Sequence, residues 1–153
     1  MKKHVITCIA SGVIALASPF TWACSYDGLF TNPFSETYPG ALDVSIATQI
    51  AIRSKHMQPV PEVNGQAGLR RASWWLNLMT KAHPDLPKGS YVYLVDHQLW
   101  SRISETGGSI EVHVSPPTEN VKVFQISEAA LHNLVEKEIT IKQARELGVL
   151  SET

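Results

Sequence analysis

The chain has 153 residues, of which 44% are hydrophobic and 8% aromatic, enough for one domain with a buried core but not comfortably for two. Its 13 basic residues nearly balance its 14 acidic ones, and loss of Lys2 and Lys3 with an N-terminal leader leaves 11 basic residues and a net charge of −3. This mildly acidic balance excludes nucleic acid as an expected partner, because binding to phosphates needs clustered positive charge.

The first 23 residues have the order of a secretory signal peptide. Lys2 and Lys3 precede an apolar stretch over 5–17, and small residues stand one and three positions before a cleavage point after Ala23. A cut after Ala17 is the alternative. The apolar stretch is shorter than the roughly 18 to 20 residues that span a bilayer, so we expect a leader rather than a membrane anchor. The sequence therefore predicts a periplasmic or secreted protein.

Cys24 would be the first residue of the mature chain. The second cysteine, Cys8, lies in the leader, so the mature chain has no partner for an internal disulfide. Cys24 is also a possible lipidation site, although Thr21 and Trp22 are not the aliphatic and small residues that usually precede an acylated cysteine. We expect membrane anchoring only if Cys24 is acylated.

Residues 24–40 predict an irregular arm, and residues 41–153 predict a single domain. The arm is rich in turn formers and in aromatic residues whose rings we expect to pack on the domain, namely Tyr26, Phe30, Phe34 and Tyr38.

Two helices are predicted at the start of the domain. The first covers about 41–56, with an apolar face at helical spacing made of Leu42, Ile46, Ala47, Ile50 and Ala51. The second covers about 67–82 and ends before Pro84, with a core face made of Leu69, Ala72, Trp75, Leu76 and Met79.

Four strands follow, at about 91–95, 99–103, 110–114 and 121–126. A hairpin turn at 105–108 would place Arg102 opposite Glu111 and Trp100 opposite His113. This register sends the aliphatic side chains of the hairpin toward the core and gathers these four residues on the other face.

Two short helices close the chain. Ser127 is placed to cap the first helix, Thr140 and Gln143 form a capping box for the second, and Gly148 is placed to end it. The fold class is therefore α+β, with two N-terminal helices, a four-strand antiparallel meander and two short C-terminal helices.

The segment 121–150 (VKVFQISEAALHNLVEKEITIKQARELGVL) has the order strand, serine-led helix, short break, and helix with an alanine and a closing glycine. In this order it resembles the C-terminal part of the sterol-carrier-protein-2-like domains, and the preceding hairpin is in the corresponding place. The resemblance implies a hydrophobic tunnel for a lipid or other apolar ligand between sheet and helices, and no catalysis. The chain departs from that family by its exported aromatic-rich arm and by the two helices before its sheet.

Two groups of residues are candidate binding surfaces. Trp100, Arg102, Glu111 and His113 would form a polar binding face by cross-strand pairing, although Arg102 and Glu111 could equally be an exposed structural ion pair. On the second helix each arginine of the pair 70–71 stands four residues before a tryptophan. Arg71 and Trp74 are the candidates for a partner patch there, with Trp75 in the core.

Metal and catalytic sites have weaker support. A copper or zinc site would recruit Cys24, Met57 and the histidines 56, 83, 97 and 113, but their spacing matches no metal motif, so we expect no cofactor. Asp96 and His97 are the one adjacent acid–imidazole pair. As neighbours on a strand they would point to opposite faces, so we assign no catalytic residue.

These observations predict an exported, non-enzymatic domain that binds a small apolar ligand or a protein partner of the envelope. A periplasmic metal-binding protein and a small hydrolase-like enzyme are the alternatives.

Overall fold

The computed structural model describes residues 38–118 and 121–153, and it confirms the α+β class. The predicted signal peptide, Cys24 and most of the predicted arm lie outside the described residues. Helices and strands follow in the order α1 (Ala41–Arg53), α2 (Gly65–Ala82), β1 (Tyr91–Leu94), β2 (Leu99–Ile103), β3 (Ile110–Val112), β4 (Val123–Ile126), α3 (Glu128–Val135), α4 (Ile141–Glu146) and β5 (Leu150–Glu152). Among the described helices, none combines the length and the apolar character needed to cross a bilayer.

The predicted four-strand antiparallel meander is wrong in its last strand. The sheet has five strands in the order β3-β2-β1-β4-β5, and only β1 to β3 form a meander. β4 pairs with the other side of β1 and runs parallel to it, while the unpredicted β5 pairs antiparallel with β4. The connection from β3 to β4 contains Pro116 and Pro117, which have no backbone N–H for a ladder, so it cannot continue as a hairpin. The chain crosses instead to the far edge of β1.

The β2–β3 hairpin follows the predicted register only in part. Arg102 lies opposite Glu111, as expected. The predicted pairing of Trp100 with His113 is wrong, because β3 ends at residue 112 and His113 has a φ of 62°. A positive φ turns the backbone out of the strand, and the N–H of Val114 donates to the carbonyl of Trp100 at 3.1 Å.

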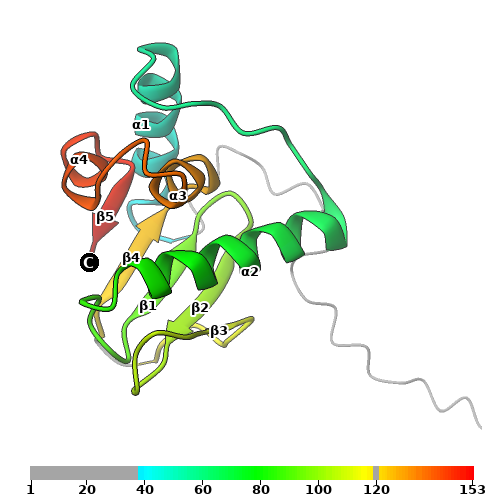
Figure 1. Ribbon diagram of the computed structural model, residues 1–153, viewed down its shortest axis with the longest axis vertical. Helices are drawn as coiled ribbons and strands as arrows, with labels where there is room; N and C mark the ends of the chain where they lie inside the picture. Colours follow the sequence, from blue (N-terminus) through cyan, green and yellow to red (C-terminus); the bar gives the residue numbers. More distant parts are fainter. Residues whose placement is uncertain (1–37, 119–120) are drawn as a thin grey trace, which may run out of the picture.

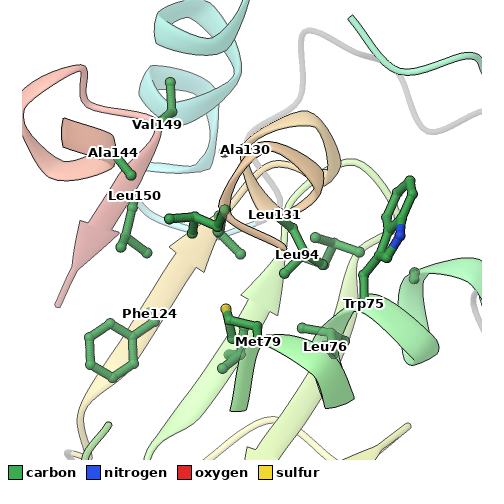
Figure 2. Packing of buried hydrophobic residues seen from close by; sticks show 14 of the residues in the cluster. Trp75, Leu76, Met79, Leu94, Phe124, Ala130, Leu131, Ala144, Val149 and Leu150 are labelled. Carbon is green, nitrogen blue, oxygen red and sulfur yellow. The ribbon is translucent and has the colours of Figure 1, made fainter. Parts of the chain in front are cut away.

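The main core lies between the sheet and the helices α2, α3 and α4. Figure 1 shows α2 lying across β1 and β2, with α3 and α4 beside β4 and β5. The predicted core face of α2 is confirmed for Ala72, Trp75, Leu76 and Met79, which are all buried. Figure 2 shows Trp75, Leu76 and Met79 in the same cluster as Phe124 of β4 and Leu131 of α3. Burial of this cluster removes much apolar surface from water and stabilises the layered arrangement.

The predicted apolar face of α1 is confirmed for Ala51, which is buried, and for Ala47, which packs against the core, but it is wrong for the three large side chains. Leu42, Ile46 and Ile50 are 37%, 50% and 59% exposed. The residues that α1 buries are smaller, namely Ala41, Val44, Thr48 and Ala51. Small side chains let the helix backbone approach the domain closely, and the Thr48 hydroxyl is satisfied by the carbonyl of residue 44 and by the hydroxyl of Ser127, at 2.8 Å each. Close approach and hydrogen bonding therefore select a different face from the most hydrophobic one.

A second, smaller cluster covers the other face of the sheet. It contains Tyr93 and Val123 of the sheet with the first turns of α1, and the rings of Tyr38 and Trp100 pack against it. Their ring centres are 5.0 Å apart in an edge-on arrangement. The amide of Gln125 donates to the carbonyl of residue 39 at 2.8 Å, which fixes the start of α1 on the sheet.

The predicted helix signals at the C-terminus are confirmed. The Ser127 hydroxyl accepts from the N–H of Ala130 at 3.1 Å, and Thr140 and Gln143 form a complete capping box. Gly148 follows α4 with a φ of 73°, a left-handed conformation that glycine adopts without strain.

Thr140→Ala is expected to lower the free energy of unfolding by about 1 kcal/mol, because the backbone N–H of Gln143 loses its acceptor. Chemical denaturation of the two proteins measures this difference. Lys142→Ala is the control, since Lys142 is exposed on the same helix and its change should stay within roughly 0.5 kcal/mol. Equal losses in the two variants would mean that the cap contributes nothing.

Candidate functional site

Glu128, the first residue of α3, stands at the centre of a group of ionisable side chains. It is only 9% exposed. Its backbone N–H donates to the Asp96 carboxyl oxygen Oδ2, and the neighbouring Ser127 hydroxyl caps Ala130. The first N–H groups of a helix have no partner within the helix, so these two acceptors satisfy the buried end of α3.

Each oxygen of the Glu128 carboxylate contacts a nitrogen-bearing side chain. Arg71 reaches Oε1 with Nε at 3.0 Å and Nη2 at 2.9 Å, and His97 Nε2 lies 2.9 Å from Oε2. Burial alone would raise the pKa of Glu128, but the hydrogen bonds and charges of His97 and Arg71 outweigh it and lower the pKa. Glu128 is therefore held as a carboxylate. We call Arg71, Asp96, His97 and Glu128 the Glu128 cluster.

Arg71 joins three parts of the fold, namely α2, the α1–α2 loop and α3. It comes from α2, donates from Nη1 to the carbonyl of Pro61 in the α1–α2 loop at 2.9 Å, and places its guanidinium carbon 4.9 Å from the ring centre of Trp75. The predicted four-residue spacing of arginine and tryptophan thus forms a contact within the domain. Trp74, the other candidate for a partner patch, is 59% exposed and does not join the cluster.

A cavity of about 360 Å³ lies beside the Glu128 cluster, and we call it the Asp96 cavity. One wall is apolar and is made of Ile52, Pro59, Val60, Val63 and Ala129. The polar lining comes from Thr48, Gln49 and Asn64. The ionisable lining comes from Glu62, Asp96, His97 and Glu128. The end of α1, the α1–α2 loop, the β1–β2 turn and the start of α3 therefore enclose one space.

The α1–α2 loop is fixed as a wall of this cavity at two points. The side-chain amide of Asn133 on α3 accepts from the N–H of Gln58 and donates to its carbonyl, both at 2.9 Å. Arg71 holds Pro61 three residues later. The two anchors bracket Pro59 and Val60, so the apolar wall has a defined position.

The expectation that Asp96 and His97 point apart is wrong. β1 ends at Leu94, and both residues lie in the turn before β2, where strand alternation does not apply. Both reach the first residue of α3. Burial of the carboxyl raises the pKa of Asp96, while the Glu128 N–H and His97 oppose this effect. Because the residue as a whole is exposed, water also offsets part of the effect of burial.

The predicted sheet-face site lies elsewhere. Trp100, Arg102, Glu111 and His113 do not line the Asp96 cavity. Trp100 stacks at 4.6 Å on the buried ring of Tyr93, and the Arg102 guanidinium binds Glu105 at 2.5 Å instead of pairing with Glu111. Their role in binding stays a prediction. Within residues 38–118 and 121–153, no group of three or more His, Cys, Asp or Glu has an arrangement that could hold a metal ion.

Sequence reasoning did not identify Glu128, Thr48 or Asn133 as site residues. Ser127 was identified as a helix cap, which placed Glu128 in the first turn of α3. The sequence also contained the acid–imidazole pair of Asp96 and His97 next to a predicted strand end. Local patterns could not show that Glu128 contacts Arg71, 57 residues away, and Asp96, 32 residues away.

Comparison of the chain with family models, with curated proteins and with solved structures found no match.

Proposed function

We propose that this chain is a small-molecule binding domain that acts after export, and that the Asp96 cavity is its binding site. The observation that carries the proposal is a cavity in which an apolar wall meets the ionisable side chains of Asp96, His97 and Glu128. A volume of about 360 Å³ lies within the roughly 300 to 1,000 Å³ typical of ligand pockets. Its lining combines an apolar wall with convergent polar groups, which can fix the orientation of a ligand.

Preorganisation supports the same proposal. Arg71 and His97 contact both oxygens of Glu128, and Asn133 and Arg71 fix the loop wall, so the side chains are positioned by contacts within the chain itself. A site whose side chains are already positioned loses less conformational entropy when it binds.

An apolar ligand between sheet and helices, as the sterol-carrier-like resemblance implies, has less support. A hollow with an entirely apolar lining does lie there, bordered among others by Met79, Phe124 and Leu134. Its volume is about 10 Å³, roughly that of one water-sized probe. A lipid would have to separate α2 from the sheet. We therefore propose a compact ligand with both apolar and polar parts, in the Asp96 cavity.

Nuclear magnetic resonance titration of the chain from Cys24 onward tests the proposal. The probes are cyclohexylamine, cyclohexanol and cyclohexanecarboxylate, which share a six-carbon ring and differ in their polar group. At least one probe is expected to shift the backbone amide signals of Gln49, Val60 and Ala129 in a saturable way. Absence of saturable shifts with all three probes, or shifts confined to β4 and α4, would contradict the proposed site.

Ala129→Leu is expected to weaken binding of the responding probe by at least about tenfold, because the added carbons occupy the cavity. Ala82→Leu is the matched control, since Ala82 is exposed at the end of α2 and its substitution should leave the affinity unchanged. Equal affinity in the wild type and Ala129→Leu would show that the probe binds elsewhere.

A further inference from the structure

Resting on the proposed function, we infer that the ligand of the Asp96 cavity is an organic cation: a compact apolar body carrying an ammonium group that binds Asp96. The juxtaposition that carries this inference is a positioned carboxyl group, which forms no ion pair with a lysine or arginine side chain of the described residues, beside an apolar wall.

The charges around the cavity favour a cation. Three carboxyl groups line it, on Glu62, Asp96 and Glu128. The positive charges next to them come from the guanidinium of Arg71, which binds Glu128, and from the imidazole of His97 when it is protonated. With His97 neutral, carboxylates outnumber cations by two, and with His97 protonated they still outnumber them by one. An anionic ligand would therefore be repelled.

The carboxyl groups differ in the hydrogen bonds and ion pairs that they already form with neighbouring residues. Both oxygens of Glu128 are engaged, one by Arg71 and the other by His97. The Asp96 carboxyl accepts backbone N–H groups from Glu128 and from its own residue, and His97 lies close enough to act on it electrostatically. Among residues 38–118 and 121–153, no lysine or arginine side chain forms an ion pair with Asp96 or with Glu62. Asp96 is held against the first turn of α3 by the Glu128 N–H, so of these two carboxylates it is the positioned acceptor for a further charged donor.

An ammonium group fits this acceptor. It has three N–H donors and no acceptor, and its hydrogen bonds to a carboxylate are roughly twice as strong as those between neutral groups. A neutral alcohol of the same size would fill the apolar wall but leave the charge of Asp96 unpaired. The wall that includes Ile52, Val60 and Ala129 would contact the hydrocarbon part of either ligand.

Isothermal titration of cyclohexylammonium and cyclohexanol at pH 7.5 separates these contributions. We expect the ammonium to bind at least about fivefold more tightly than the alcohol in the wild type, and to lose this advantage in Asp96→Asn. Asparagine keeps an oxygen that accepts from the Glu128 N–H, so α3 stays capped. Cyclohexanol binding to the variant serves as the check that the cavity is intact. Asp85→Asn, at an exposed position outside the cavity, is the matched control.

The outcomes distinguish the inference from the proposed function. If cyclohexanol or cyclohexanecarboxylate binds as tightly as the ammonium, or if Asp96→Asn keeps the full ammonium advantage, the inference is wrong while the binding site stands. If none of the probes binds the wild type, the proposed function itself fails. Should Asp96→Asn not fold, Glu62→Gln at an exposed position of the same cavity replaces it, with an expected loss of roughly twofold for the ammonium alone. An unchanged ammonium affinity in that variant would count against the inference.

Discussion

Replacement of Glu128 with alanine is expected to lower the free energy of unfolding at pH 7 by about 2 to 3 kcal/mol. Removing one partner of a buried ion pair typically costs about 3 to 5 kcal/mol, because the other charge stays buried without compensation. Arg71, His97 and Glu128 keep 19%, 15% and 11% of their side-chain surface exposed, so water reduces that loss. Denaturation in urea measures the change.

The loss should depend on pH with a defined sign. The folded-state pKa of Glu128 lies below its ordinary value of 4.5, so its contribution is fully present above about pH 4.5 and disappears as the pH falls through the folded pKa. The stability difference between wild type and Glu128→Ala is therefore expected to narrow on acidification from pH 5 to pH 3. Glu136→Ala, at an exposed position at the other end of α3, is the control and should stay within about 0.5 kcal/mol. A pH-independent difference would show that the cluster is not held by the charge of Glu128.

The parts of the fold that the sequence predicts correctly depend on short-range signals. The cap at Ser127, the capping box at Thr140 and the glycine at 148 each involve residues within a few positions of one another. The buried face of α2 is also correct, because Ala72, Trp75, Leu76 and Met79 recur at helical spacing on one side of the helix. In these elements local chemistry and packing favour the same arrangement.

The pairing of β4 and the buried face of α1 were not predictable in the same way. Both are decided by residues far away in sequence. β4 lies next to β1 rather than β3, so its place follows from a crossover and not from a turn. On α1 the most hydrophobic side chains are outside, while Thr48 is buried because Ser127 offers it a hydrogen bond. Hydropathy alone favours the opposite orientation of this helix.

The candidate site illustrates how one strand boundary changes the chemistry. If β1 continued through Asp96, alternation would separate the carboxyl group of this residue from the imidazole of His97. Because β1 ends at Leu94, the two side chains share a turn and meet Glu128. The predicted strand over 91–95 is one residue too long, because residue 95 already begins the turn. The acid–imidazole pair therefore does lie in the candidate site, but the prediction that its two side chains point to opposite faces was wrong.

Asn133→Ala is expected to destabilise the protein by about 2 kcal/mol and to release the loop wall of the Asp96 cavity. Asn133 is fully buried and holds both the N–H and the carbonyl of Gln58. Alanine would leave these two partly buried backbone groups without partners, at a cost of about 1 to 3 kcal/mol for each lost partner before water reaches them. Arg71 would remain as the single anchor of the loop, at Pro61.

Hydrogen exchange measures this release directly. The amide of Gln58 should exchange faster in Asn133→Ala than the change in global stability accounts for, because it loses the acceptor that protects it. Asn77→Ala is the matched control, because the Asn77 amide bonds only to the carbonyl of Ser73 within α2 and should leave the Gln58 amide protected. Cyclohexanol, which depends on the apolar wall at Val60, should bind Asn133→Ala more weakly than Asn77→Ala. Retained protection at Gln58 together with unchanged cyclohexanol affinity would show that the loop keeps its position without Asn133, and that the wall of the cavity depends on Arg71 alone.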